Sequence, residues 1–490
     1  MRLTNLTASS KELVLEGEDR EVTGITADSR EVAKGTLFAA IPGTAHDGRT
    51  FIPDAVARGA TAVLVPADTD TATIAARGIS VLKTADIRGA ISTLAALFYP
   101  RQPAIIAAIT GTSGKTSTTQ FAREIWQNLA HKSASIGTLG LVTAKETRYG
   151  SLTTPDAITL HKLLNEVTGQ SITHLAMEAS SHGLALKRLD HVKVKIGAFT
   201  NLSHDHLDYH GTMEEYLAAK LRLFLHVLPE GAAAVLNADV PEFEVFSHAA
   251  QKRNQKIFSY GTHGKEIKLL SIAPDAKGQV LKLELLGNHR HVLLPLIGRF
   301  QAWNGLCALG IALASDEDPI RAASALGKVT GVPGRMQLVG QKNGATVFVD
   351  YAHKPDALEN VLASLRPHVA ARKGARLGVV FGCGGNRDKG KRPIMGSIAQ
   401  RLADWVIVTD DNPRNENPAT IRKEILASCK PGPNLREIGD RAMAIAAGID
   451  QLGAGDVLVI AGKGHEPGQI IGDYTLPFDD ADVARKALGA

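Results

Sequence analysis

A lysine at the end of a short glycine-rich segment carries the strongest chemical signal in the chain. Residues 109–116 read Ile-Thr-Gly-Thr-Ser-Gly-Lys-Thr, after an apolar run and before a helical pattern near 116–130. A strand, a glycine turn and a helix start form a cradle whose backbone N–H groups and positive helix end face a phosphate. Although Ile109 replaces the first glycine of the usual pattern, the segment predicts binding of a nucleoside triphosphate by these residues: Gly111, Thr112, Ser113, Gly114, Lys115, Thr116 and Ser117.

The middle of the chain holds a second group of residues that could bind metal ions. Glu178 ends a short apolar run, residues 201–210 contain three histidines and two aspartates, and Lys220 lies on a predicted helix. With the hydroxyl of Thr116, these groups offer oxygen and nitrogen ligands to divalent cations on a triphosphate. A zinc site or a solvated loop is the alternative for the histidines, and an exposed helix face is the alternative for Lys220.

Three polar segments near the C-terminus could bind a small charged molecule. Residues 384–388 read Gly-Gly-Asn-Arg-Asp, residues 411–414 read Asp-Asn-Pro-Arg, and residues 462–466 read Gly-Lys-Gly-His-Glu. An arginine fork can hold a carboxylate through two parallel hydrogen bonds. Taken alone, Asn-Pro is equally typical of a plain turn beside a surface arginine.

Short β-branched runs that alternate with amphipathic segments predict how these residues are positioned. Such alternation is typical of parallel α/β layers. The predicted strands lie at 61–65, 175–178, 194–199, 347–350, 377–381, 406–409 and 457–460. Ligands bind beyond the carboxyl ends of parallel strands. The polar residues that end these runs are therefore site candidates: Glu178, Asn201, Asp350, Asp410 and Lys463.

Length and composition indicate a multidomain globular protein. A chain of 490 residues exceeds the size at which a single core keeps growing, and about three domains are expected. Prolines at 99–103 and glycines and prolines at 331–335 predict boundaries that give domains 1–99, 100–333 and 334–490.

Charge and cysteine content narrow the class of partner. The net charge of +5 is mild, and basic and acidic residues are interspersed, which argues against nucleic-acid and membrane partners. The three cysteines are far apart, the N-terminus lacks an apolar signal core, and no run approaches the ~18 apolar residues of a membrane span. We therefore expect a cytoplasmic protein with free thiols.

Taken together, the motifs resemble those of the Mur ligases, the ATP-dependent amide-forming enzymes of peptidoglycan precursor synthesis. The resemblance runs nearly end to end, through residues 110–116, 177–182, 201–206, 218–220, 334–335 and 350–353. It implies an α/β fold of three domains. These are a small N-terminal domain for a uridine nucleotide, a central phosphate-loop ATPase domain with a parallel sheet, and a C-terminal Rossmann-like domain.

The resemblance also implies the cofactors ATP and Mg²⁺, and CO₂ that carbamylates Lys220. The carbamate, His206 and Glu178 would bind metal, with Thr116 on the nucleotide-bound ion. The implied catalytic residues are Lys115, Lys220 and His206. By the same resemblance Asn304 contacts adenine, and Arg335 and Asp350 close over the nucleotide. Gln301 replaces a family asparagine, so no adenine contact is assigned to it.

The ends of the chain resemble the family member that adds the third peptide residue. Residues 28–30 and 43–49 match its uridine-nucleotide domain, although Asp-Ser-Arg alone is typical of an ordinary turn. The implied ligands of the UDP-linked substrate are Ser29, His46, Thr153, Thr154, Ser180 and Arg188. The implied ligands of meso-diaminopimelate are Arg387, Asp411, Asn412, Pro413, Arg414, Gly462 and Glu466.

The implied reaction joins meso-2,6-diaminopimelate to UDP-N-acetylmuramoyl-L-alanyl-D-glutamate through an acyl phosphate. The partners would be these small molecules and ATP, and the protein would be a monomer. Three alternatives stay open: a homologue that adds L-lysine, a folylpolyglutamate synthetase, and a phosphate-loop module without ligase chemistry. An arginine fork favours diaminopimelate over L-lysine, because diaminopimelate carries one more carboxylate.

Overall fold

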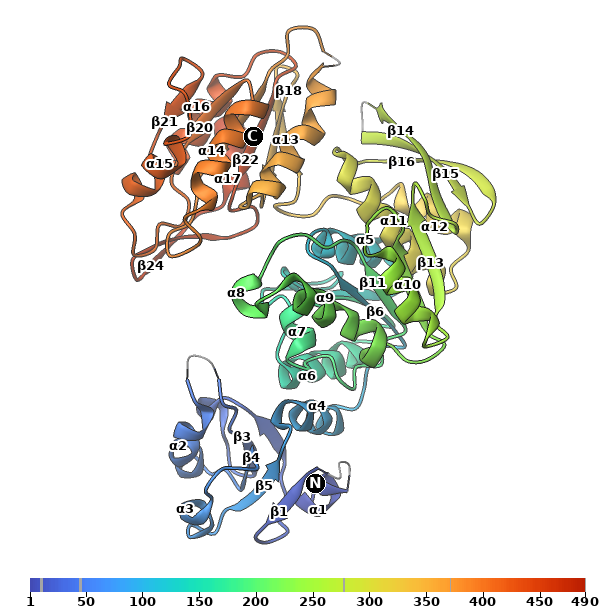
Figure 1. Ribbon diagram of the computed structural model, residues 1–490, viewed down its shortest axis with the longest axis vertical. Helices are drawn as coiled ribbons and strands as arrows, with labels where there is room; N and C mark the ends of the chain where they lie inside the picture. The colour runs from blue at the N-terminus through green and yellow to red at the C-terminus, as the bar shows by residue number, and fades with distance from the viewer. Residues whose placement is uncertain (9–11, 44–45, 276–277, 371, 490) are drawn as a thin grey trace. The chain divides into compact units, whose positions relative to one another are not determined.

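The computed structural model describes residues 1–8, 12–43, 46–275, 278–370 and 372–489 (Figure 1). The chain divides into two compact units. Unit 1 holds Met1–Lys268 and Leu306–Ala325, and unit 2 holds Leu269–Gly305 and Leu326–Ala490. Strands alternate with helices in both units, which confirms the predicted α/β class. In the described part of the chain, no helix is long and apolar enough to cross a membrane.

Residues 1–99 of unit 1 form a sheet in the order β1-β5-β4-β3-β2, in which β1 is antiparallel to β5 and the other pairs are parallel. Strand β4 (Ala62–Pro66) is buried on both faces, because Leu64 packs in one hydrophobic cluster and Val63 in another. The other elements are β1 (Val14–Glu16), β2 (Gly24–Thr26), β3 (Thr36–Ala39), β5 (Ser80–Thr84), α1 (Leu3–Thr7), η1 (Ser29–Glu31), η2 (Gly48–Phe51), α2 (Ile52–Ala57), α3 (Ala72–Ala75) and α4 (Ile87–Phe98).

The central sheet of unit 1 places β6 (Ile105–Thr110) between β10 (His174–Glu178) and β11 (Ile196–Phe199), with all three strands parallel. The strand order is β13-β12-β11-β6-β10-β7-β8-β9. Parallel strands end at one edge of the sheet, so the residues that follow β6, β10 and β11 lie close together. The other elements are α5 (Lys115–Asn128), β7 (Ser133–Gly137), β8 (Gly140–Val142), β9 (Thr147–Arg148), α6 (Ala157–Gly169), α7 (Ser181–Ala185), α8 (Leu207–His210), α9 (Met213–Arg222), η3 (Leu223–Val227), β12 (Ala233–Asn237), α10 (Phe243–Gln251) and β13 (Lys256–Gly261).

The segment after β13 contributes to both units. Its elements are β14 (Ile267–Asp275), β15 (Gly278–Leu285), β16 (Asn288–Leu294), α11 (Arg299–Ala314) and α12 (Pro319–Leu326). Within unit 2, β15 and β16 form an antiparallel hairpin.

The main sheet of unit 2 has the order β17-β18-β22-β19-β20-β21, with β17 antiparallel to β18 and the other pairs parallel. In β22 (Val457–Ala461), Val459 packs in one hydrophobic cluster and Leu458 in another, as expected for a strand covered on both faces. The other elements are β17 (Gln337–Lys342), β18 (Ala345–Asp350), α13 (Pro355–Ala370), β19 (Leu377–Phe381), α14 (Lys391–Leu402), β20 (Trp405–Val408), α15 (Pro418–Leu426), β21 (Leu435–Glu437), α16 (Arg441–Asp450), β23 (Gly468–Ile471), β24 (Tyr474–Pro477) and α17 (Asp480–Leu488).

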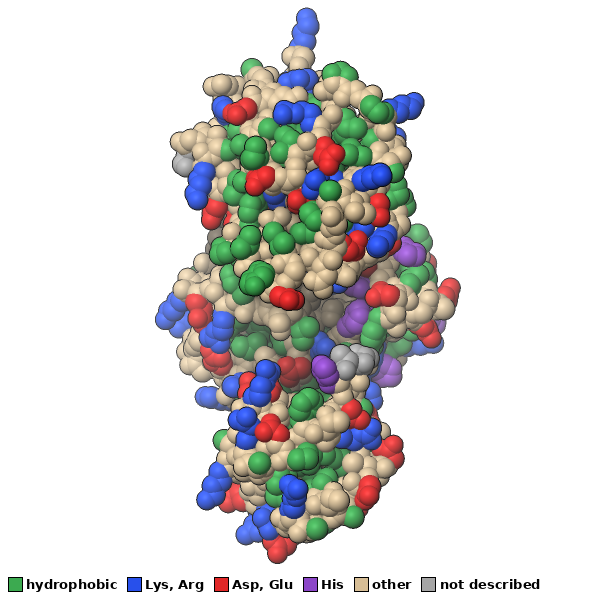
Figure 2. All heavy atoms as spheres, turned by 90° about the vertical axis from the view of Figure 1, so that its left-hand side faces the viewer, with side chains coloured by type: hydrophobic (Ala, Val, Ile, Leu, Met, Phe, Trp, Pro, Cys, Tyr) green, Lys and Arg blue, Asp and Glu red, His purple; other side chains and the backbone are tan. Residues whose placement is uncertain are grey.

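The strands predicted from apolar runs are confirmed as β4, β10, β11, β18, β19, β20 and β22. The predicted helix near 116–130 is α5. On the face drawn in Figure 2, basic and acidic side chains are interspersed, as the sequence indicates. The domain boundaries at residues 99 and 333 stay predictions.

Candidate active site

The phosphate loop joins the end of β6 to the start of α5 in unit 1. Gly111 and Gly114 have φ angles of 145° and 84°, a backbone region that favours glycine. A Cβ atom on Gly111 would also collide with the hydroxyl of Thr200. Helix α5 begins at Lys115, with Gly114 as its N-cap residue, so the first backbone N–H groups of the helix are left for an anion. The loop therefore fits a phosphate group, since within the described residues no side chain caps the start of this helix.

Lys115 and its neighbours supply the charge and hydroxyl groups of this loop. Lys115 Nζ donates to the carbonyl oxygens of Gly111 and Thr112, each at 2.9 Å. Thr116 and Ser117 are buried at the start of α5. A lysine held over the loop by its own carbonyls can move to a phosphate oxygen without a change in the backbone.

Asn201, just after β11, holds the phosphate loop in place. Its Oδ1 accepts from Ser113 N at 2.9 Å, its Nδ2 donates to Ser113 O at 3.2 Å, and its backbone oxygen accepts from Thr112 N at 2.8 Å. The sequence marked Asn201 as a strand-terminal candidate but did not assign it to the nucleotide site. Its position directly after β11, the strand next to β6, could have indicated this role.

Glu178 and Lys220 are both buried near this edge of the sheet. Glu178 is 1% exposed, and its carboxylate accepts from the Thr138 backbone N at 2.8 Å and from the Thr138 hydroxyl at 3.3 Å. Lys220, on α9, is also 1% exposed, with Nζ 4.1 Å from the centre of the Tyr216 ring. The Tyr216 hydroxyl lies 3.1 Å from Thr112 Oγ1. The alternative of an exposed helix face for Lys220 is therefore wrong.

The predicted ligand His206 belongs to a cluster of imidazoles. Its ring centre lies 4.9 Å from that of His182, which lies 5.4 Å from that of His210. Burial lowers the pKa values of His182 and His210, and the charge of Lys220 lowers them further. His206 has a φ angle of 54°, is exposed, and lies 3.4 Å from the Asp205 carboxylate. His182 and Tyr216 were not predicted as site residues, although His182 lies in the segment that contains Glu178. His210 was included only as one of the three histidines of residues 201–210.

Four of the residues predicted to hold the UDP-linked substrate lie beside Glu178. Thr154 Oγ1 donates to Glu178 O at 2.8 Å and accepts from Ser180 N at 3.0 Å, and Arg188 Nη1 donates to Thr154 O at 2.7 Å. Thr153 Oγ1 lies 3.2 Å from the Thr138 hydroxyl. These residues form one hydrogen-bonded group at the carboxyl edge of the sheet.

Ser180 also has a local structural task, since its Oγ accepts from Gly183 N at 3.0 Å and caps α7. The other two predicted residues lie in the N-terminal sheet region: Ser29 is buried in η1, and His46 is exposed before η2. Within the described residues, no hydrogen bond joins Ser29 or His46 to the Thr154 group.

The residues predicted to contact the nucleotide from the later part of the chain are neighbours within unit 2. Asn304 Nδ2 donates to Gln301 Oε1 at 3.0 Å, and Gln301 Nε2 donates to Arg335 O at 3.4 Å. Asp350 Oδ2 accepts from Met336 N at 2.7 Å. Burial raises the pKa of Asp350 to about 6, and the Arg335 guanidinium opposes this shift. Gln301, which replaces the family asparagine, thus orients Asn304.

The three polar segments near the C-terminus converge at the carboxyl edge of the unit 2 sheet. Asn412 Nδ2 donates to Glu466 Oε2 at 2.8 Å. Lys463 Nζ donates to Asn412 Oδ1 at 3.2 Å and lies 3.5 Å from Glu466 Oε2. Arg414 Nη1 donates to Gly385 O at 3.0 Å. The segments therefore bring an arginine fork, a carboxylate and an amide into one cluster, as a small zwitterion requires.

The remaining residues of the predicted set border this cluster. Gly462 has a φ angle of 117°, and a Cβ atom there would collide with the Asp411 carboxylate. Arg387 Nη1 donates to Asn386 O at 3.1 Å, and Pro413 precedes Arg414 in the same turn. Lys463 is fully buried and was not assigned to the site, although it was among the strand-terminal candidates.

Comparison with protein-family models identifies three matching regions. Residues 21–99 match the Mur ligase family catalytic domain, residues 109–312 match the Mur ligase middle domain, and residues 334–464 match the Mur ligase glutamate ligase domain. The matched regions contain the phosphate loop, the buried lysine of α9 and most of the unit 2 cluster.

Curated relatives resemble the chain over its whole length. A protein of Bradyrhizobium diazoefficiens is 50% identical over 474 residues, which cover 96% of this chain and 95% of the relative. A protein of Rhizobium meliloti is 48% identical over 495 residues, with 100% of both chains covered. Both relatives are named UDP-N-acetylmuramoyl-L-alanyl-D-glutamate–2,6-diaminopimelate ligase.

Solved structures agree with this relationship. A structure described as the same kind of ligase has 34% identity and a TM-score of 0.71, and the match covers 96% of this chain and 95% of that one. MurF from Acinetobacter baumannii and a folylpolyglutamate synthase from Mycobacterium tuberculosis, each 18% identical with TM-scores of 0.64 and 0.63, share the fold. By its full-length relatives and its three matching regions, the chain belongs to the Mur ligase family.

Proposed function

We propose that this chain joins meso-2,6-diaminopimelate to UDP-N-acetylmuramoyl-L-alanyl-D-glutamate at the expense of ATP, in peptidoglycan precursor synthesis. The observation that carries the proposal is the 50% identity to a ligase of that name over 96% of the chain. The substrates of this reaction, ATP and a UDP-linked molecule, are nucleotides of the cytosol. We therefore propose a cytoplasmic location and small molecules as the partners.

The cluster in unit 2 supports diaminopimelate as the incoming amino acid. Arg414 would hold one carboxylate and Arg387 the other, while Glu466 and Asp411 would receive an ammonium group. Asn412, Pro413 and Gly462 would shape the site. L-lysine lacks one carboxylate and would leave a guanidinium unpaired, at a cost of about 2–4 kcal/mol.

The phosphate loop supports ATP as the second substrate. Residues 111–117 would hold its phosphates, while Asn304 would contact adenine, and Arg335 and Asp350 would contact the nucleotide. The D-glutamyl carboxylate would attack the γ-phosphorus, releasing ADP and forming an acyl phosphate. The amine of diaminopimelate would then attack this carbonyl, lose a proton and displace inorganic phosphate. The charge of Lys115 lowers the repulsion between the carboxylate and the triphosphate.

Mg²⁺ would be held by Thr116, Glu178, His206 and a carbamate on Lys220. When bound, Mg²⁺ neutralises negative charge on the phosphates. Carbamylation by CO₂ requires a neutral amine, and burial disfavours the charged form of a lysine. The burial of Lys220 at 1% exposure therefore supports this modification.

The UDP-linked substrate would be held by Ser29, His46, Thr153, Thr154, Ser180 and Arg188. Arg188 donates to the Thr154 carbonyl and the Thr154 hydroxyl donates to the Glu178 carbonyl, which ties the substrate residues to the proposed metal ligand.

Phosphate release by the purified protein tests the proposal. Release should require ATP, Mg²⁺, the UDP-linked dipeptide and meso-diaminopimelate together, and L-lysine should support little turnover. Equal turnover with L-lysine would show that the chain is the lysine-adding homologue. Turnover with folate and glutamate would favour a folylpolyglutamate synthetase, and nucleotide binding without an amide product would favour a module without ligase chemistry.

Lys220→Ala provides a second test of the same proposal. The variant should lose turnover but keep nucleotide binding, since residues 111–117 are unchanged. Bicarbonate-free preparation of the natural chain should lower activity, and added bicarbonate should restore it. An active Lys220→Ala variant would refute the proposed carbamate.

A further inference from the structure

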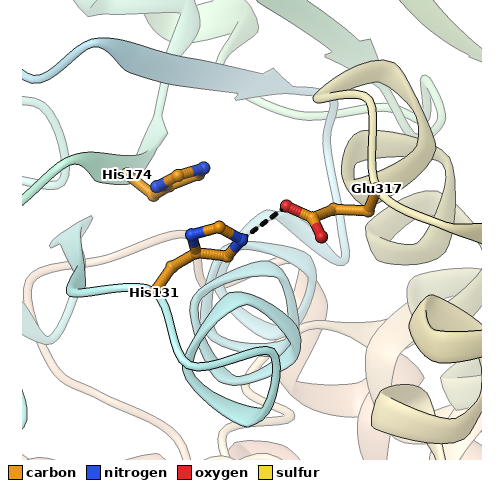
Figure 3. A group of neighbouring side chains, drawn as sticks. All are labelled: His131, His174 and Glu317. Atoms are coloured by element: carbon orange, nitrogen blue, oxygen red, sulfur yellow. Dashed lines mark ion pairs between the residues drawn. The ribbon is translucent and has the colours of Figure 1, made fainter.

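Two histidines and a glutamate from three distant segments meet in unit 1, away from the phosphate loop. His131 follows α5, His174 begins β10 and Glu317 follows α11. His131 Nε2 lies 2.6 Å from Glu317 Oε1, and the two imidazole centres are 4.1 Å apart (Figure 3). One possible ligand atom of each residue lies within 4.8 Å of the others. In the described ranges, this is the one group of three His, Cys, Asp or Glu residues with such spacing.

This group is separate from the proposed ligase site. His174 begins β10 and Glu178 ends it, and a strand rises about 3.3 Å per residue, which puts the two ends about 13 Å apart. The phosphate loop, Glu178 and Asn201 all lie at the carboxyl ends of parallel strands. His174 lies at the opposite, amino-terminal end of its strand. The Mg²⁺ ligands proposed above therefore do not include these residues.

The segments that carry the three residues are held together by other contacts. Trp126 Nε1 donates to Ser315 Oγ at 2.9 Å, and Asn128 Nδ2 donates to Ala325 O at 3.3 Å. Both bonds link α5 to the chain on either side of Glu317. The group is thus supported by packing that does not depend on its own ion pair.

His174 has the surroundings of an oriented metal ligand. Its Nδ1 lies 2.9 Å from the Thr173 hydroxyl, which fixes the ring and leaves Nε2 as the coordinating atom. Its side chain is buried beside Trp126, with the ring centres 5.1 Å apart.

We propose that His131, His174 and Glu317 bind one Zn²⁺ ion, with water as the fourth ligand. Two imidazole nitrogens and one carboxylate are a donor set that Zn²⁺ accepts in tetrahedral geometry. Ligand atoms about 2.0–2.2 Å from zinc lie roughly 3.3 Å from one another, so the side chains must shift by about 1–2 Å. His131 is partly exposed, which lets water reach the ion. The bound ion would connect residue 317 to the amino-terminal edge of the sheet and stabilise unit 1.

Zinc binding by the full-length chain tests this proposal. Metal-stripped protein in millimolar Mg²⁺ is dialysed against zinc chloride, and bound zinc is measured by mass spectrometry. Glu317→Gln keeps the size of the side chain, and His131→Ala alters a partly exposed position. The matched control is His263→Ala, which removes a histidine 2.8 Å from the Asp239 carboxylate elsewhere in unit 1.

The natural chain and His263→Ala should each bind one more zinc ion than Glu317→Gln or His131→Ala. Zinc should raise the melting temperature of the first pair by several degrees and leave the second pair unchanged. Cobalt should give the natural chain the strong visible absorption of a tetrahedral site, and the two site variants should lack it.

Equal zinc content in all four proteins would overturn the proposal and leave an ion pair between His131 and Glu317. Absence of tetrahedral cobalt absorption in the natural chain would overturn it as well, whatever the stability of the variants. Ligase turnover is not a readout in these experiments, so failure of the proposed function would not affect their result.

Discussion

The phosphate loop of unit 1 and the charged cluster of unit 2 are built in different ways. The loop is one continuous segment that offers backbone N–H groups, and two glycines give it its shape. The cluster joins three segments, and its charged and amide side chains bond to one another or to the backbone of a neighbouring segment. A site made of backbone tolerates many neighbours but few changes of its own residues. A site made of side chains depends on every partner that orients them.

Lys115→Ala tests the loop side of this comparison and should have the largest effect. The substitution removes the one loop side chain that carries a positive charge to the triphosphate. We expect turnover to fall by about a thousandfold or more with every amino acid substrate. Steady-state phosphate release measures the loss, with the exposed Lys252→Ala as the control. A defect confined to the KM for diaminopimelate would contradict the division between the two sites.

Arg414→Ala tests the cluster side and should have the next largest effect. Loss of a two-bond contact with a carboxylate costs about 2–4 kcal/mol, so the KM for diaminopimelate should rise about 30- to 1000-fold. The KM values for ATP and the UDP-linked substrate should stay the same, because the phosphate loop is unaltered. The exposed Arg436→Ala serves as the control in the same amino acid titration. A parallel rise in the KM for ATP would contradict the division between the phosphate loop and the unit 2 cluster.

Lys463→Met tests whether a buried lysine is needed to orient the side chains of the unit 2 cluster. The methionine keeps the apolar stem but removes the cation that donates to Asn412 Oδ1 and lies beside Glu466. A hydrogen bond to a charged group contributes about 1.5–3 kcal/mol, so the KM for diaminopimelate should rise about 10- to 100-fold. Turnover at saturating diaminopimelate should change little. An unchanged KM, with Lys430→Ala as the exposed control, would show that Asn412 and Glu466 hold their positions without Lys463.

The pH dependence of stability should give the smallest effect. It tests the packing of helix α6 in unit 1. Burial lowers the pKa of His161 to about 4 from an ordinary value near 6.5. The unfolded chain therefore binds the proton first, and stability falls as the pH drops from about 6.5 toward 4. Between pH 7 and 5.5 this group should account for about 1 kcal/mol of lost stability.

His161→Gln should reduce this pH dependence, because glutamine does not titrate. Urea unfolding of both proteins at pH 7 and 5.5 gives the difference. The same loss in the variant and the natural chain would show that other groups cause the acid sensitivity of unit 1.

Much of the fold could be read from local patterns. The runs at 377–381 and 457–460 form strands nearly to the predicted residue, because apolar β-branched segments of that length favour buried strands wherever the chain places them. The phosphate loop was equally readable, since its strand, turn and helix start are contiguous. The predictions for Glu178 and Asn201 at one edge also follow from parallel strands that end together.

Other features could not be read in this way. Lys220 and Lys463 look like ordinary lysines in the sequence, yet both are buried, because their surroundings come from other segments. The role of Asn201 in holding Ser113, and the hydrogen bond from Asn304 to Gln301, depend on side-chain directions that no spacing predicts. The cluster of His131, His174 and Glu317 left no signal, since the three residues have no motif spacing.

The amino-acid sequence by itself determined the α/β class, the position of the phosphate loop and the family resemblance of the chain. These features depend on neighbours within a few residues, where backbone preference and apolar periodicity act. Only the tertiary structure decided which lysines lose contact with water, which amides orient the charged cluster of unit 2, and where two histidines meet a glutamate. Those outcomes depend on contacts between residues far apart in the chain, and their free energy exists only once the segments have packed together.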